Sequence, residues 1–336
     1  MPIAKDKDVA RAVEILRSGG VVAFPTETVY GLGADALNPQ AVARVFAIKR
    51  RPPDHPLIVH LPDVSYLKDW ACDIPRAAYR LAEKFWPGPL TLILKRAAIV
   101  PDSVTGGQDS VGLRVPGHPV ALALLEKFGG AVAAPSANRF GHVSPTRAEH
   151  VREELGSEAD MILDGGPCRV GLESTIVSLL DARPLILRPG AISRSMLAEA
   201  LGEEIETGTA EKITLRTPGM LVSHYAPHTP LHKVPAAELY ERAFALVTQG
   251  QRVGVLTRQA GEPASGLHYY LLPSDPKGYA HELYDTLHKA DARRLDVLLI
   301  EDPPQDEAWL AVRDRLSRAT STSKLLNSST DTRETG

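Results

Sequence analysis

Residues 49–60, KRRPPDHPLIVH, place a basic turn between a helix and a buried strand. The residues before the turn follow a helical pattern, and Pro52 with Pro53 prevents that helix from continuing. The apolar run 57–61 is short enough to be a buried strand. Such a turn holds cations rigidly and suits a phosphate group, because lysine supplies a point charge and arginine a bidentate fork. The alternative is that the basic residues only close the helix against its dipole.

The chain upstream of this turn predicts the order helix, strand, polar loop, helix. A helix that begins within residues 6–8 is followed by a short buried strand over 21–24. That strand leads into PTETVYGLG, residues 25–33, a loop rich in hydroxyl groups and glycine. A second helix then starts at Asn38 and runs to Lys49. Open α/β sheets bind ligands just beyond their strand ends, so we expect the loop to contact a ligand.

Downstream of the turn, hydrophobic periodicity and glycine or proline breaks predict more helices and strands of the same domain. The predicted helices are 64–70, 75–85, 118–128, 147–155 (begun by Ser144 and Pro145) and 194–201. The predicted strands are 90–94, 110–115, 131–134, 161–163, 175–180 and 185–188. We therefore expect residues 1–202 to form a twisted α/β domain with an open ligand cavity.

A second, smaller domain is expected after a linker. Residues 203–230 lose the apolar periodicity and contain several threonines and prolines, which is typical of an interdomain segment. Residues 231–326 return to a βαβ pattern and predict a Rossmann-like domain with a parallel sheet. Its predicted helices are 236–248, 281–292 and 307–320, and its strands are 253–257, 268–272 and 297–300. The polar tail 327–336 is expected to be disordered.

Composition excludes several classes of protein. With 38 Lys and Arg against 41 Asp and Glu, the 336-residue chain carries a net charge of −3, which argues against a globally basic nucleic-acid coat. Its two cysteines lie far apart and outside any CxxC motif, so we expect no disulfide framework in a reducing compartment. The chain shows neither a signal peptide nor an apolar run of membrane-spanning length. We therefore expect a cytoplasmic protein without a membrane span.

Polar loops next to several strands indicate a ligand pocket. Hydroxyl and amide side chains cluster there, and four cations lie near them in the predicted sheet. The hydroxyl and amide residues are Thr26, Thr28, Ser136, Asn138, Ser144, Ser174 and Thr175, and the cations are Lys49, Arg51, Arg114 and Arg188. Because strand ends gather at one edge of an α/β sheet, these groups would build an anion-binding pocket. The alternative is that they only form turns.

Two side chains within this set lie in apolar strands. His60 and Arg114 each need a partner if they are buried. A structural ion pair would satisfy that need, and so would the carboxylate of a substrate.

Two other patterns resemble binding motifs but lack the required context. The glycines of GLGADA, residues 31–36, come six residues after a strand, whereas a dinucleotide fingerprint places them at once. His224, His228 and His232 recur every four residues, but intervening prolines exclude a single helix that would present them to zinc. We therefore expect no metal site made by side chains alone.

Several motifs, in chain order, are similar to those of the Sua5/YrdC family of threonylcarbamoyl-AMP synthases. They cover residues 8–228, and the later ones match the two-domain Sua5 branch of the family (Sua5/YrdC/YwlC) rather than the single-domain branch. The quoted motifs are PTETVYGLGADA, the Lys49-x-Arg51 pair with PLIVH, LRVPGHP, APSANRFGHVSPT, GLESTIV, LRPG and SHYAP. The resemblance implies a YrdC-like catalytic domain followed by a Rossmann-like Sua5 domain.

The resemblance also implies a reaction. Family members are nucleotidyltransferases that join L-threonine, bicarbonate or CO2, and ATP into L-threonylcarbamoyladenylate, and they release pyrophosphate. This is the first step of the t6A modification at adenosine 37 of tRNA, so tRNA and a downstream threonylcarbamoyl-transferase complex are implied partners. The cofactor implied is Mg2+, held through the ATP phosphates. Catalysis of this kind should consist mainly of charge neutralisation and positioning.

Site residues carry over by motif. The family's catalytic pairs match Lys49 with Arg51, and Ser136 with Asn138. The ATP-binding positions match Lys49, Arg51, His55, Ser110, Ser136, Asn138, Ser144, Arg188 and Tyr225. The threonine-binding positions match Thr28, His60, Arg114, Ala134 (main chain only) and Ser174. Arg114 is the expected partner of the threonine carboxylate, and the linker carrying Tyr225 is expected to fold over the pocket. His55 stands where the family more often has asparagine, so a phosphate contact there would titrate near neutral pH.

Two other functions fit parts of the pattern. An RNA-binding protein could use a basic concave face without chemistry, although the acidic balance of the chain weighs against it. A carbamoyl-transfer module, as in the YrdC-like domain of hydrogenase maturation factors, would need an acylphosphatase-like or zinc-finger segment that this sequence lacks.

Overall fold

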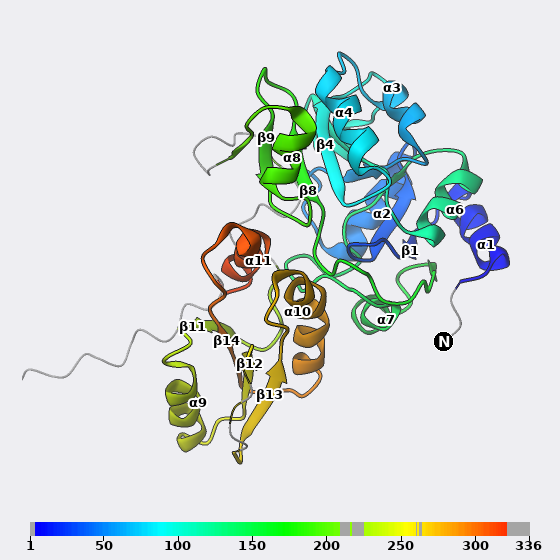
Figure 1. The fold of residues 1–336 in the computed structure, drawn as a ribbon. Coiled ribbons are helices and arrows are strands. Elements are labelled where there is room, and N and C mark those ends of the chain that lie inside the picture. Colours follow the sequence, from blue (N-terminus) through cyan, green and yellow to red (C-terminus); the bar gives the residue numbers. More distant parts are fainter. Residues whose placement is uncertain (1–3, 209–215, 217–224, 260, 262–263, 321–336) are drawn as a thin grey trace, which may run out of the picture.

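The computed structural model describes residues 4–208, 216, 225–259, 261 and 264–320, and they form two α/β units (Figure 1). The larger unit is built on a ten-stranded sheet in the order β10-β9-β8-β4-β5-β3-β6-β2-β1-β7. The smaller unit has a four-stranded sheet in the order β11-β14-β12-β13. In Figure 1, α10 and α11 of the smaller unit lie on the side that faces the larger unit, whereas α9 lies away from it.

The elements of both units follow in chain order. The larger unit contains α1 (Asp6–Arg17), β1 (Val22–Phe24), β2 (Gly31–Asp35), α2 (Pro39–Lys49), β3 (Ile58–His60), η1 (Val64–Tyr66), α3 (Leu67–Trp70), α4 (Arg76–Phe85), β4 (Leu90–Lys95), α5 (Asp102–Thr105), β5 (Ser110–Arg114), α6 (Pro119–Phe128), β6 (Val132–Ala133), α7 (Ala148–Leu155), β7 (Met161–Ile162), β8 (Thr175–Ser178), β9 (Leu185–Arg188), α8 (Arg194–Leu201) and β10 (Glu206–Thr207). The smaller unit contains β11 (Leu231–Val234), α9 (Leu239–Thr248), β12 (Val253–Thr257), β13 (Leu267–Leu271), α10 (Pro276–Asp291), β14 (Val297–Glu301), η2 (Glu307–Trp309) and α11 (Leu310–Thr320).

The helix before the basic turn forms and ends as its sequence predicts. The Asn38 side chain caps α2 by accepting from the main-chain N–H groups of Gln40 and Ala41, and Pro39 occupies the first turn. The helix ends at Lys49, and the capping residue Arg50 has a left-handed φ of 52° and ψ of 41°. The chain then passes through the proline turn into β3.

The alternation of β3 and β5 directs two polar side chains to one face of the sheet. These strands are parallel neighbours, and His60 pairs in register with Arg114. On the opposite face, Val59 and Leu113 belong to a core that also contains residues of α2, α3, α4 and α8. Since successive strand residues point to opposite faces, His60 and Arg114 share the face that these four helices leave uncovered.

The other end of the sheet is covered on both faces. Val22 and Phe24 of β1 pack with residues of α1 and α6. Ala23, between them, packs with residues of α2 and α7 on the other side. Each of the three β1 residues is therefore buried, which explains why this strand shows no polar alternation.

The strand β2 lies where the sequence predicted a loop. Gly31–Asp35 forms an antiparallel strand between β1 and β6, so the predicted loop 25–33 ends at residue 30. A Cβ on Gly33 would lie 2.5 Å from Val132 and 2.7 Å from Phe24, so the sheet requires glycine here. The small residues of β2 lack the apolar pattern that would predict a strand. The glycines of GLGADA allow close packing against the neighbouring strands.

Other boundaries also differ from the prediction. The predicted linker contains β10, which extends the first sheet beside β9, and β11 precedes the first predicted element of the second sheet. α7 begins at Ala148 rather than at Ser144, and the short α5 was not predicted. β10, with two residues, and α5, with four, are too short for hydrophobic periodicity to reveal. The tail 327–336 lies outside the described residues.

The smaller unit confirms the predicted parallel sheet. All three pairings among β11, β14, β12 and β13 are parallel. The crossovers through α9 and α10 cover the sheet, as expected for a Rossmann-like βαβ arrangement. Within the described part of the chain, no helix is both long enough and apolar enough to cross a bilayer.

A buried carboxylate joins the two units. Glu173, before β8, accepts from Nε of Arg315 of α11 at 2.7 Å, from Oγ of Ser144 at 2.6 Å and from the hydroxyl of Tyr284 of α10 at 3.2 Å. Arg315 is fully buried, and Val29 and Leu172 of the larger unit share a core with α10. The units therefore meet through a packed interface that contains an ion pair.

Candidate active site

One pocket lies at the centre of the larger sheet, on the face that α2, α3, α4 and α8 leave uncovered. It is bounded by the loop after β1, the ends of β3 and β5, the loop after β6, the segment before β8, the end of β9 and the linker. Its lining residues are Thr26, Thr28, Val29, Gly31, Arg51, Ile58, His60, Arg114, Ala134, Pro135, Ser136, Glu173, Ser174, Arg188 and Tyr225. Polar loops that are far apart in the sequence therefore do gather around one cavity.

Arg114 is held rigidly at one wall of this pocket. Its Nη2 donates to Oε1 of Glu27 at 2.7 Å and to Oγ1 of Thr28 at 2.9 Å, and its Nε donates to the Gly88 carbonyl at 3.3 Å. The other Glu27 oxygen accepts from the Gly117 N–H at 2.8 Å. Both ion-pair partners are almost fully buried. The bonds described here leave Nη1 for a ligand, so the pair orients the guanidinium without occupying all of it.

His60 lies beside Arg114 and is kept neutral. Burial, together with the nearby Arg114 charge, lowers the pKa of His60 to about 3. Its Nδ1 has no hydrogen-bond partner among the described atoms, although the ring is buried. A buried polar atom without a partner costs free energy, so a ligand in the pocket that bonds this nitrogen would remove the cost.

Ser174 connects Arg188 to the sheet. Nε of Arg188 donates to the Ser174 carbonyl at 3.0 Å, and its Nη2 donates to Oγ of Ser174 at 3.1 Å. That hydroxyl also lies 2.8 Å from Oγ1 of Thr91. Burial lowers the pKa of Arg188, and the chain thus places a second desolvated guanidinium in the pocket.

The basic turn contributes Arg51 to the pocket and Lys49 to its support. Nζ of Lys49 is buried and donates to the carbonyls of Ser136 and Asn138, both at 2.5 Å. Arg51 donates from Nη2 to the Pro56 carbonyl and stacks over Phe140, and its buried Nε has no partner among the described atoms. Burial lowers the pKa of Arg51 to about 10, so it stays charged at neutral pH.

Tyr225, from the segment predicted to be a linker, lines the pocket. Its φ of 64° is left-handed, which is rare for a residue with a side chain and costs of order 1–3 kcal/mol. The ring is held by Tyr284, stacked at 5.9 Å, and by the guanidinium of Arg315 at 5.4 Å. The pocket measures about 50 Å³, enough for a few water molecules at roughly 10–15 Å³ each.

The predicted site residues fall into two groups in the structure. All five predicted threonine contacts line the pocket: Thr28, His60, Arg114, Ala134 and Ser174. Of the predicted ATP contacts, Arg51, Ser136, Arg188 and Tyr225 line it. The predicted ATP contacts outside its lining are Lys49, His55, Ser110, Asn138 and Ser144. Their roles remain predictions.

The second group is placed by specific contacts. Asn138 donates to the carbonyls of Arg139 and His142 and so shapes the loop after β6. The Ser144 hydroxyl donates a hydrogen bond to Glu173. Ser110 lies at the opposite end of β5 from Arg114. Burial and Arg51 lower the pKa of His55, which keeps it neutral at pH 7.

Sequence reasoning assigned no role to two acidic residues of this site. Glu27 and Glu173 lie inside the quoted motifs PTETVYGLGADA and GLESTIV. Their role is seen only in the structure, where Glu27 pairs with Arg114 and Glu173 pairs with Arg315. Arg114 itself could have indicated Glu27, because a buried arginine in an apolar strand requires a carboxylate partner. Glu27 provides that partner.

The chain is similar to known proteins along its length. Residues 14–190 match the family described as "Telomere recombination", and residues 192–321 match the family described as "Threonylcarbamoyl-AMP synthase, C-terminal domain". A relative named threonylcarbamoyl-AMP synthase from Bacillus subtilis is 41% identical over 325 residues, covering 94% of this chain and 93% of the relative. One of the same name from Pyrococcus abyssi is 39% identical over 317 residues, covering 92% of each. The crystal structure of Pyrococcus abyssi Sua5 complexed with L-threonine matches with a TM-score of 0.87 at 37% identity, covering 94% of this chain and 95% of that one.

Proposed function

Since this chain belongs to the Sua5 family of threonylcarbamoyl-AMP synthases, we propose that it joins L-threonine, bicarbonate or CO2, and ATP into L-threonylcarbamoyladenylate and releases pyrophosphate. The observation that carries the proposal is the pairing of Arg114 with His60 in one pocket with Arg51 and Arg188. The first pair suits an amino-acid carboxylate, and the second pair suits phosphates.

The proposed threonine subsite is formed by Thr28, His60, Arg114, Ala134 and Ser174. Nη1 of Arg114 would bind the carboxylate, and Nδ1 of His60 lacks another partner. A relative crystallised with L-threonine supports threonine as a substrate, because it matches the chain over nearly its whole length. Neutral His60 adds no charge next to Arg114, so it leaves the attraction for the carboxylate to the guanidinium.

The proposed chemistry joins two anions. The neutral threonine amine attacks the carbon of CO2 and loses a proton, and one carbamate oxygen then attacks the α-phosphorus of ATP while the bond to pyrophosphate breaks. Arg51 and Arg188 would neutralise the phosphates of ATP in a pocket with little water. Lys49 would position Ser136 and Asn138 by holding their carbonyls. The protein supplies positioning and charge, and it forms no covalent intermediate.

We also propose that Mg2+ enters with ATP. Glu173 is the acidic residue among those that line the pocket, and both of its oxygens already accept hydrogen bonds. The phosphates of ATP are therefore the ligands that fit Mg2+ here, which would neutralise part of their charge.

The product determines the proposed partners. A carbamoyladenylate is a mixed anhydride that water hydrolyses, so a downstream threonylcarbamoyl-transferase that acts on tRNA is proposed to take it up. The proposed compartment is the cytoplasm, where ATP and tRNA meet, and the free thiols of Cys72 and Cys168 suit it.

The basic turn gives a matched set of variants. Arg51→Ala is expected to lower kcat/KM for ATP by about a hundredfold, because it removes a desolvated cation from the pocket. Lys49→Ala is expected to lower activity as well, since two buried carbonyls lose their donor. Arg50→Ala should leave activity unchanged, because Arg50 is exposed. Steady-state kinetics of pyrophosphate release checks all three, and a larger loss for Arg50→Ala than for the other two would show the assignment to be wrong.

The function itself is tested by the substrates that pyrophosphate release requires. Release should need ATP, threonine and bicarbonate together, and a product of the mass of threonylcarbamoyladenylate should form with it.

A further inference from the structure

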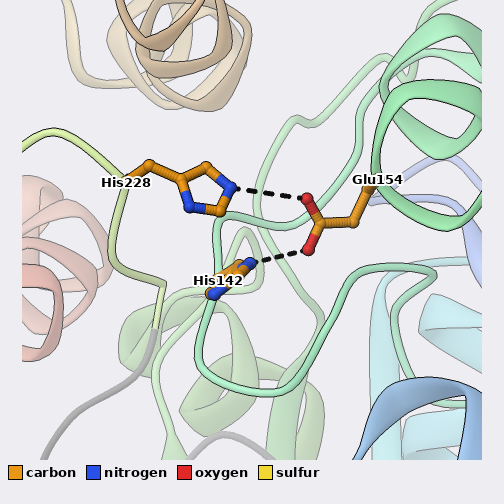
Figure 2. A group of neighbouring side chains, drawn as sticks. All are labelled: His142, Glu154 and His228. Carbon is orange, nitrogen blue, oxygen red and sulfur yellow. Dashed lines mark hydrogen bonds and ion pairs between the residues drawn. The ribbon is translucent and has the colours of Figure 1, made fainter. Parts of the chain in front are cut away.

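Three metal-ligating side chains converge outside the substrate pocket (Figure 2). His142 comes from the loop after β6, Glu154 from α7 and His228 from the linker, and their ligand atoms all lie within 4.8 Å of one another. Nδ1 of His142 is 2.6 Å from Oε1 of Glu154, and Nε2 of His228 is 3.7 Å from Oε2. Figure 2 shows the two imidazole rings directed at the same carboxylate from two separate segments.

We propose that His142, Glu154 and His228 bind one zinc ion, which ties the linker to the catalytic domain. Two imidazole nitrogens and one carboxylate are a known zinc donor set, completed by water at the fourth position. Tetrahedral zinc with bonds of about 2.0–2.1 Å requires donor atoms roughly 3.4 Å apart. The two separations given above, 2.6 Å and 3.7 Å, lie on either side of that value. Small side-chain rotations would bring the donor atoms to tetrahedral spacing.

The surroundings leave room for an ion and its water. The three residues lie at the edge of a cavity of about 210 Å³ that is also lined by Glu153, His150 and His288. His150 and His288 are engaged elsewhere, because His150 lies against Asp285 and Nε2 of His288 lies 3.2 Å from the Ser144 carbonyl. The His228 side chain is 63% exposed, which leaves it free to turn toward an ion.

The main chain already holds the ligands close together. The Ala226 N–H donates to the Gly141 carbonyl at 2.9 Å, which joins the linker to the loop of His142. Asp291 of α10 accepts from the N–H groups of His228 and Thr229 at 2.8 and 2.9 Å. Because the backbone is fixed before metal binds, little ordering cost remains for the ion to offset.

The site would lie beside two segments that also line the substrate pocket. His142 follows the loop of Ser136 and Asn138, and His228 follows Tyr225 by three residues. A zinc ion would therefore help to hold Tyr225 in its present position without contacting substrate. This role is separate from that of Mg2+, since nitrogen ligands favour zinc and Mg2+ prefers oxygen.

The test uses the full chain, freed of metal by a chelator and titrated with Zn2+ by calorimetry in excess Mg2+ without ATP or threonine. We expect one Zn2+ per chain, and Co2+ should give the strong visible bands of a tetrahedral site. Glu154→Gln and His228→Asn should each weaken Zn2+ binding by at least about tenfold. The neighbouring controls Glu153→Gln and His232→Asn should bind as the parent does.

Thermal unfolding gives a second readout. Zn2+ should raise the midpoint temperature of unfolding of the parent and not that of His228→Asn. The His228 side chain is exposed, so its replacement should not disturb the fold. Absence of stoichiometric Zn2+ binding by the parent would overturn the proposal. Equal losses in the two controls, or a loss in His288→Asn as large as in Glu154→Gln, would overturn the ligand assignment. Because no substrate is present, these results are independent of the synthase activity.

Discussion

Replacing Arg114 with lysine is expected to lower kcat/KM for threonine on the order of a thousandfold, while the KM for ATP stays the same. Lysine can keep one ion pair with Glu27, but it cannot also bond Thr28, Gly88 and a substrate carboxylate from one rigid plane. The variant retains a buried cation opposite Glu27, so the fold should survive. Steady-state kinetics with each substrate varied in turn measures the effect.

A matched control tests whether any arginine-to-lysine replacement would have the same effect. Arg96, just after β4, pairs with exposed aspartates outside the pocket, and Arg96→Lys should leave both kinetic constants unchanged. A rise in the KM for ATP in Arg114→Lys, with threonine unaffected, would contradict the assignment of Arg114 to the threonine carboxylate.

Replacing Arg315 with methionine is expected to lower the free energy of unfolding by about 3–5 kcal/mol. Arg315 is fully buried, and its loss leaves Glu173 buried without its cation at the contact between the two units. Urea denaturation measures the change. Arg313→Met on the same helix, which removes only bonds to the Pro304 and Asp306 carbonyls, should cost about 1 kcal/mol.

The same ion pair predicts a dependence on pH. Burial alone would raise the pKa of Glu173, but Arg315, Arg188 and the Ser144 hydroxyl lower it to about 2, against an ordinary value of 4.5. A carboxyl group with a lowered pKa stabilises the fold above its unfolded pKa, so this contribution is present above about pH 4.5 and is lost as the pH falls toward 2. The double variant Glu173→Gln/Arg315→Met should lose this dependence and regain part of the stability. Equal stability of the parent and Arg315→Met would show that the ion pair does not hold the interface.

The sequence predicts much of the fold because its main signals are local. The cap at Asn38, the stop at Pro52 and the parallel βαβ pattern after residue 250 each depend on a few neighbouring residues, and the structure confirms them. β2 and β10 were not predicted, because β2 is rich in glycine and β10 consists of two polar residues, so neither shows the apolar pattern of a strand.

The sequence predicted which residues line the candidate site better than it predicted how their side chains are placed. The motifs predicted that Thr28, His60 and Arg114 belong to one site, and all three line one pocket. The register of β3 and β5 explains why His60 and Arg114 are adjacent. No local pattern could show that Nζ of Lys49 points at the Ser136 and Asn138 carbonyls, since that requires the loop after β6 to reach α2. The meeting of His142, Glu154 and His228 likewise depends on how the linker folds back.

The proposed function requires that this chain activates ATP only for a carboxylated threonine. The most direct measurement is pyrophosphate release by the purified chain with ATP and Mg2+, with threonine and bicarbonate each left out in turn. We expect release with the complete mixture and only background release when either is missing. Release at the full rate without threonine would show that this chain is not a threonylcarbamoyl-AMP synthase.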